Sequence, residues 1–448
     1  MNFILKLPAL RPVLGGLWLL LASVAFADRI ITEINLPEAE NACARNDGKA
    51  CWQLGAGYYQ GHGKIPQDYE KAYKFFNLSC ILGYPRGCTY LGLMHANGQN
   101  ARVNYKKAAD LFLKACRQDD GTGCLYFGRA CASGYGTPQH YGNAFESFNK
   151  GCSLRSGSSC LEVGQMYREG TAVAKSPAMA SEFFTTGCRL GEGAACRILG
   201  GMQYAGEGIG QNYNKAFGNF ARGCNLKDAG SCRMQGKMYL LGQAAPRNAR
   251  RALQFFSVAC TLRDAEACWD AGSLYWEGKA LERSYPKAFE YFEKGCHLGL
   301  GVSCGGLGLL YYGGLGTRQD DKKAARTFEK ACDLDTAPSC VMLGQMYLEG
   351  RGVNLDPQTA AGYFDRACKL GAKQGCAAYN SAQEAAAAAS AVQEAAAGSD
   401  AAAGPDAAAG TERGAARSTV KAASTAAAEL FQAPPAEAGQ GPVDAAGD

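Results

Sequence analysis

Three features are scarce in this chain, and each scarcity excludes a class of function. There are four histidines in 448 residues, without the spacing of a metal site: His62, His95, His140 and His297. No apolar run beyond residue 27 is long enough to cross a membrane. Forty-six basic against 41 acidic residues leave too little charge for a nucleic-acid surface. We therefore expect no metal, no cofactor, no nucleic acid, and no membrane contact once the N-terminal segment is removed.

The N-terminal segment has the three parts of a secretory signal peptide. Basic residues at Lys6 and Arg11 precede an apolar stretch over residues 13–26, and the A-x-A sequence ending at Ala27 is a cleavage site. An uncleaved membrane anchor is the alternative, but the apolar stretch is too short to span a bilayer comfortably. We predict a signal peptide over residues 1–27 and a secreted or periplasmic mature chain, where disulfides persist.

Cysteine is abundant, and its spacing is regular. Twenty of the 21 cysteines form ten C-x7-C pairs, and successive pairs are 36 residues apart after a first step of 37. A fixed period of this length indicates a repeat array, and paired cysteines in an oxidising compartment indicate disulfides. The expected bridges are Cys43–Cys51, Cys80–Cys88, Cys116–Cys124, Cys152–Cys160, Cys188–Cys196, Cys224–Cys232, Cys260–Cys268, Cys296–Cys304, Cys332–Cys340 and Cys368–Cys376. Cys131 is left as a free thiol; we expect a small buried substitute for a tyrosine, with an intermolecular disulfide or a reactive thiol as alternatives.

The segment after each pair predicts a first helix, helix A. Counting from the second cysteine of each of nine units, glycine recurs four and ten residues on, as in Gly55 and Gly61, and tyrosine is usual at seven, as in Tyr58. Offsets 0, 3, 4 and 7 share one helical face. The later glycine fits a helix C′ position, which needs a positive φ. The earlier glycine lets a neighbouring helix approach closely.

A second helix, helix B, ends at the first cysteine of the next pair. An N-cap residue type stands twelve positions before that cysteine in eight of nine units, the exception being His140. Alanine stands eight positions before it and phenylalanine four before it in every unit, as in Ala72 and Phe76. We expect the alanine to seat against the helix A glycine and the phenylalanine to fill the core. The predicted fold class is all-α: an α/α solenoid of nine disulfide-stapled, 36-residue helical hairpins.

Composition divides the mature chain. Residues 28–50 are expected to form an N-terminal cap, and residues 51–380 the repeat solenoid, in which Asn380 replaces the helix A glycine and makes the tenth helix A a C-terminal cap. Residues 381–448 are rich in alanine and poor in large apolar side chains, so we expect a disordered tail. The first stretch of that tail, residues 381–397, is rich enough in alanine to extend the last helix.

The repeat resembles a known family. The pattern LG..Y..G.GV..D..KA..FF..AC.LG.A.GC, with good instances at residues 51–80 and 340–376, is similar to the Sel-one-like repeat, a relative of the tetratricopeptide repeat. The C-x7-C pairs and the signal peptide resemble the secreted Helicobacter cysteine-rich proteins. The resemblance covers about residues 38–380. It implies a right-handed superhelix of α-hairpins, acting as an adaptor for partner proteins or as a β-lactam binder or β-lactamase.

A serine β-lactamase needs an S-x-x-K motif together with K-T-G. The chain has S-x-x-K matches but neither K-T-G nor K-S-G. The matches are Ser147/Lys150, Ser284/Lys287 and Ser418/Lys421. Matches this short arise by chance in a chain of this length, so we expect no catalytic residue and no enzyme. Weak β-lactam binding or hydrolysis stays open as the alternative that the resemblance implies.

Helix A positions that differ between repeats predict the binding surface. Offsets 2, 5 and 9 lie opposite the glycine and tyrosine face and hold large apolar, aromatic and charged residues. In tetratricopeptide-type solenoids helix A lines the concave surface, and exposed apolar patches mark partner sites. The candidate ligand-binding residues are Tyr90, Leu93, Tyr126, Arg129, Glu162 and Gln165. We expect a monomer that holds a peptide, protein or peptidoglycan-type ligand there; the alternative is that these residues contact the next repeat.

Overall fold

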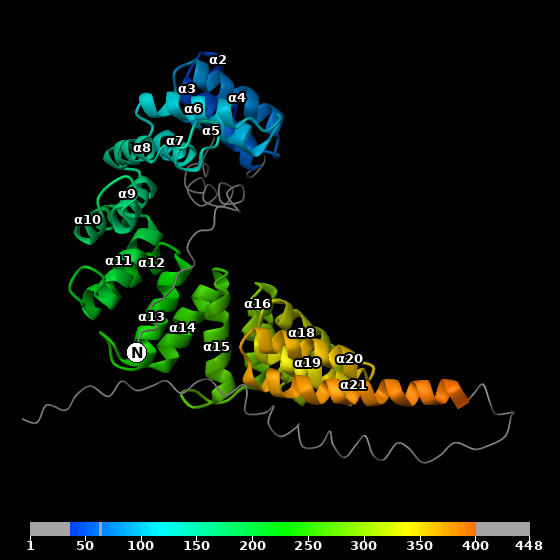
Figure 1. The fold of residues 1–448 in the computed structure, drawn as a ribbon. Coiled ribbons are helices and arrows are strands. Elements are labelled where there is room, and N and C mark those ends of the chain that lie inside the picture. The colour runs from blue at the N-terminus through cyan, green and yellow to red at the C-terminus, as the bar shows by residue number, and fades with distance from the viewer. Residues whose placement is uncertain (1–35, 62–64, 400–448) are drawn as a thin grey trace, which may run out of the picture. The chain divides into compact units, whose positions relative to one another are not determined.

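The structure, a computed structural model, describes residues 36–61 and 65–399. Over these residues the chain forms helices and no strand (Figure 1), which confirms the all-α fold class. Four predictions lie outside the described residues: the signal peptide over residues 1–27, the tail beyond residue 399, His62 and Ser418.

Helices A and B alternate along the chain as the sequence predicts, with odd labels for helix A and even labels for helix B. The chain divides into two compact units between Gln235 and Gly236, inside α13. The helices are α2 (Leu36–Ala44), α3 (Gly48–Gln60), α4 (Tyr69–Ile81), α5 (Pro85–Asn97), α6 (Tyr105–Arg117), α7 (Gly121–Ser133), α8 (Tyr141–Ser153), α9 (Gly157–Glu169), α10 (Pro177–Arg189), α11 (Gly193–Ala205), α12 (Tyr213–Asn225), α13 (Ala229–Leu241), α14 (Ala249–Thr261), α15 (Ala265–Glu277), α16 (Tyr285–His297), α17 (Gly301–Gly313), α18 (Asp321–Asp333), α19 (Ala337–Glu349), α20 (Pro357–Lys369) and α21 (Lys373–Ser399).

Each hairpin closes with a phenylalanine ring against a glycine. A Cβ atom on Gly55 would lie 2.5 Å from Cδ1 of Phe76. This corrects the prediction that an alanine would seat against the glycine, because the ring takes that place. Ala72 and its equivalents are buried beside the ring. The nine pairs are Gly55–Phe76, Gly92–Phe112, Gly128–Phe148, Gly164–Phe184, Gly200–Phe220, Gly236–Phe256, Gly272–Phe292, Gly308–Phe328 and Gly344–Phe364.

Both ends of the helices follow the predicted capping pattern, with two corrections. The nine glycines that follow helix A have φ between 63° and 82°, as their C′ position requires. The backbone N–H of Asn143 donates to Nδ1 of His140 over 3.0 Å, so this histidine caps α8 after all. Ser284 stands at the N-cap of α16 but makes no side-chain cap hydrogen bond. The other seven predicted residues cap as expected.

All ten predicted disulfides are formed, and each joins the end of a helix B to the following helix A. Their S–S distances are 1.93–2.06 Å and their Cα–Cα distances 4.4–4.8 Å. Every one of these cysteines follows a glycine, alanine or serine. A Cβ on Gly123 would lie 2.6 Å from the Cβ of Ala115. The small residues therefore allow the two helices that the disulfide joins to approach each other closely. The small residue before each paired cysteine is a second repeated pattern in the sequence, and the predictions above do not include it.

The last helix ends the array. The prediction that the alanine-rich stretch after residue 380 extends it is confirmed, because α21 runs to Ser399. Asn380 is exposed, and the side-chain amide of Gln383 donates to the hydroxyl of Tyr379 over 2.6 Å. The face that would receive a further helix B is therefore polar, as a capping element requires.

Candidate functional site

Part of the predicted helix A surface is buried between repeats. Leu93 and Tyr126 are only 4% and 5% exposed, so the expectation that they face solvent is wrong. The ring of Tyr126 stacks on Phe112 of the preceding hairpin, with centroids 5.3 Å apart. Tyr90 is half-buried, stacks on Phe76 in the same way at 5.1 Å, and burial raises its pKa to about 12. An aromatic side chain at offset 2 therefore packs against the previous repeat.

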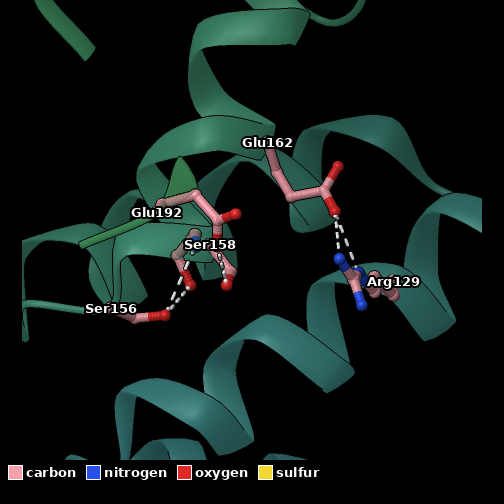
Figure 2. Close-up of polar contacts among 6 residues, drawn as sticks. Arg129, Ser156, Ser158, Glu162 and Glu192 are labelled. Carbon is pink, nitrogen blue, oxygen red and sulfur yellow. Dashed lines mark hydrogen bonds and ion pairs between the residues drawn. The ribbon is translucent and has the colours of Figure 1, made fainter. Parts of the chain in front are cut away.

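The charged members of the predicted set form one inter-repeat pair. Nε and Nη2 of Arg129 in α7 donate to Oε1 of Glu162 in α9, over 2.9 and 2.7 Å (Figure 2). The two side chains remain 27% and 24% exposed. The guanidinium of Arg129 also lies 6.0 Å from the ring centroid of Tyr126. The pair is thus positioned from both sides and still open to solvent.

Polar neighbours extend this pair along helix A of two consecutive hairpins, α7 and α9. The hydroxyl of Ser133 donates to the carbonyl of Arg129 over 2.8 Å. Gln165 is half-buried and Glu169 is exposed, one and two turns after Glu162. We call these residues the polar strip; its members are Arg129 and Ser133 of α7, and Glu162, Gln165 and Glu169 of α9.

A separate row of contacts joins the N-terminal ends of successive A helices. Ser158 donates to Oε2 of Glu192 over 2.6 Å (Figure 2), and Arg197 donates to Oδ2 of Asp228 over 3.3 Å. These bonds fix the spacing of the repeats and lie away from the offsets that the polar strip uses.

Two cavities of the described chain are lined by residues of both helices A and B, away from the predicted groove residues. The larger, of about 510 Å³, lies among α2, α3 and α4. Its wall contains Tyr58 stacked on Phe75 at 5.8 Å, and the ammonium of Lys71 stands 5.0 Å from the Tyr58 ring. A smaller cavity lies between α18 and α19. None of the six predicted ligand-binding residues lines either cavity.

Comparison with known proteins places this arrangement in a family. Eight segments match the Sel1 repeat and together cover more than half of the chain: residues 48–84, 85–120, 157–192, 193–228, 231–264, 265–300, 302–335 and 337–371. The chain belongs to the Sel1 repeat family. The Sel1 repeats here form a disulfide-rich scaffold of the kind typical of protein-interaction repeats.

Three individual proteins are similar to this chain over different shares of its length. A Sel1 repeat protein from Oxalobacter formigenes is 20% identical over 70% of this chain and 90% of its own, with a TM-score of 0.51. Cysteine-rich protein B of Helicobacter pylori is 30% identical over 29% of this chain and 92% of its own, with a TM-score of 0.25. Cytochrome c oxidase assembly factor 7A of Xenopus laevis is 36% identical over 63 residues, and the match spans 27% of that protein.

Of the two S-x-x-K serines that the structure describes, Ser147 is hydrogen-bonded inside its helix, whereas Ser284 makes no side-chain cap hydrogen bond. The hydroxyl of Ser147 donates to the carbonyl of Asn143 over 2.7 Å inside α8, and Lys150 pairs with Asp119 at 2.9 Å. The ammonium of Lys287 stands 5.1 Å from the ring of Tyr275. Over the described residues no group of histidine, cysteine and carboxylate side chains is arranged to hold a metal ion. No described helix has the length and apolar character needed to cross a membrane.

Cys131 sits at the tyrosine position of the third hairpin, α7 and α8, which lies between two of the matched Sel1 segments. In other repeats this tyrosine stacks on an aromatic residue of helix B, as Tyr167 does on Phe183 at 5.6 Å. The equivalent helix B position opposite Cys131 holds Ser147, so both members of the pair are small. The thiol is 1% exposed, and burial raises its pKa, which disfavours the reactive thiolate.

Proposed function

We propose that this protein is an extracytoplasmic scaffold that binds an extended peptide segment of a partner protein along the polar strip. The observation that carries the proposal is the Arg129–Glu162 pair. A rigid charged pair that bridges two repeats and stays accessible is a natural anchor for a ligand. The ten disulfides support an oxidising compartment, and the predicted signal peptide supports secretion or a periplasmic location.

The unused atoms of this pair match a peptide backbone. Among the described residues Nη1 of Arg129 and Oε2 of Glu162 make no hydrogen bond, since Nε, Nη2 and Oε1 form the pair. One free donor beside one free acceptor is complementary to the C=O and N–H groups of an extended chain. Ser133, Gln165 and Glu169 offer further polar groups for side chains of the ligand.

Selection from a displayed peptide library on the mature, oxidised protein tests the proposal. We expect selected peptides to bind the double variant Arg129→Ala/Glu162→Ala at least tenfold more weakly than the wild type. Arg197→Ala/Asp228→Ala is the matched control, because it removes an inter-repeat ion pair outside the strip; it should bind as the wild type does. If no peptide is selected, or if the strip variant binds equally well, the proposal is wrong.

A further inference from the structure

The smaller cavity, between α18 and α19, has an apolar floor. Its volume is about 130 Å³. Ala325 and Leu343, 4% and 1% exposed, form the floor together with Val353 of the loop after α19. This volume is well below the roughly 300 Å³ at which drug-sized ligand pockets begin, so the cavity suits a small ligand or the end of a longer one.

The rim of the cavity carries two cations without acidic partners. Lys322 and Arg326 lie one turn apart on α18, and neither takes part in an ion pair within the described residues. The nearby carboxylates are engaged elsewhere. Asp320 pairs with the neighbouring Lys323 at 3.8 Å, and Glu329, also on the rim, accepts a hydrogen bond from the hydroxyl of Tyr363 over 3.4 Å.

The loop that completes the rim is held in place. Nε of Arg351 lies 3.0 Å from Oδ2 of Asp321, its Nη2 donates to the carbonyl of Tyr312 over 3.0 Å, and its guanidinium stands 3.6 Å from the Tyr312 ring centroid. Gly352 has φ of 73° and closely approaches the carbonyl of Asp321, which leaves no room for a side chain. The cavity is therefore preformed.

This pair of cations is special to one repeat. The hairpin before it has Pro286 and Glu290 at the same two helix B positions, and the hairpin after it has Gln358 and Gly362. The two cations are thus not a requirement of the repeat, since neighbouring hairpins fold without them.

We propose that this cavity binds a carboxylate carried on a small aliphatic body. Two unpaired cations and one rim glutamate leave about one net positive charge, which suits a monoanion. The apolar floor receives the methyl or methylene groups. A free short-chain acid and the C-terminus of a peptide ending in an alanine-sized residue share this chemistry. The inference uses none of the polar-strip residues and stands apart from the proposed function.

Methyl NMR of the full mature chain tests the inference. We expect N-acetylalanine to shift the Leu343 and Val353 methyl resonances, and uncharged N-acetylalaninamide to leave them unchanged. Lys322→Gln/Arg326→Gln should weaken N-acetylalanine binding at least tenfold. Arg250→Gln removes a cation at the same helix B position of α14 and should have no effect. No shift, equal binding of the amide, or an unaffected double variant overturns the inference.

Two further probes identify the source of the ligand. Tighter binding of N-acetyl-dialanine than of propionate supports a peptide C-terminus, and the reverse order supports a free short-chain acid. Inorganic sulfate lacks an aliphatic body. If it shifts the same methyl groups as strongly as N-acetylalanine does, the site is a general anion site and the carboxylate assignment fails.

Discussion

The ring of Phe148 occupies the space that a side chain on Gly128 would need: a Cβ there would lie 2.5 Å from Cε1 of the ring. Because both residues are buried, Gly128→Ala should destabilise its hairpin by about 1–3 kcal/mol through overpacking. The midpoint of urea unfolding of the oxidised protein measures this loss.

Gly201 is the control for that substitution. It also lies inside a helix A, α11, but a Cβ there would meet nothing within 4 Å. Gly201→Ala should raise stability by about 0.5–1 kcal/mol, because alanine costs less helical entropy than glycine. Similar effects from the two substitutions would show that the ring contact does not explain the repeated glycine.

His95 should make stability fall in mildly acidic solution. Its side chain is 4% exposed, Nε2 lies 3.3 Å from the hydroxyl of Tyr73, and burial, with a contribution from the charge of Lys107, lowers its pKa. The unfolded chain therefore binds the proton more readily, so stability is lost as pH drops below about 6.5. Unfolding midpoints between pH 7.5 and 5 should decline less steeply in His95→Gln than in the wild type; equal slopes would contradict the assignment.

Removing one bridge should loosen one junction. Cys188→Ala/Cys196→Ala opens a short ring, and chain entropy predicts a loss of about 2.5 kcal/mol. Since repeats contact mainly their neighbours, hydrogen exchange should accelerate in α10 and α11 and stay unchanged in α3 and α4. Uniform acceleration over all four helices would show long-range cooperativity instead.

Nitrocefin should not be hydrolysed by the oxidised protein. The Ser147 hydroxyl is committed to a backbone carbonyl, and the Lys150 ammonium is committed to Asp119, so neither is set up as nucleophile or base. Turnover that disappears in Ser147→Ala would overturn this prediction. Turnover that survives both Ser147→Ala and Ser284→Ala would place the chemistry elsewhere in the chain.

The hairpins and their bridges could be predicted because the sequence repeats them nine or ten times. Positive φ at Gly61 or the Cys80–Cys88 bridge follows from local rules applied within one unit. The burial of Tyr126 against the preceding repeat could not be predicted in this way. Each helix A contacts both its own helix B and the neighbouring repeat, and the periodicity of a single helix indicates only the face that packs within its own hairpin. The cap at His140 was missed because a neutral ring nitrogen can also accept a hydrogen bond.

The spacing of the bridges also bears on how the chain folds under oxidising conditions. Each joins cysteines eight residues apart in the sequence, so the two thiols emerge together and can meet before later repeats exist. Oxidation can proceed from the N-terminal end, hairpin by hairpin. A cysteine that is already bonded to its partner eight residues away is no longer available to form an incorrect disulfide with a cysteine of another repeat.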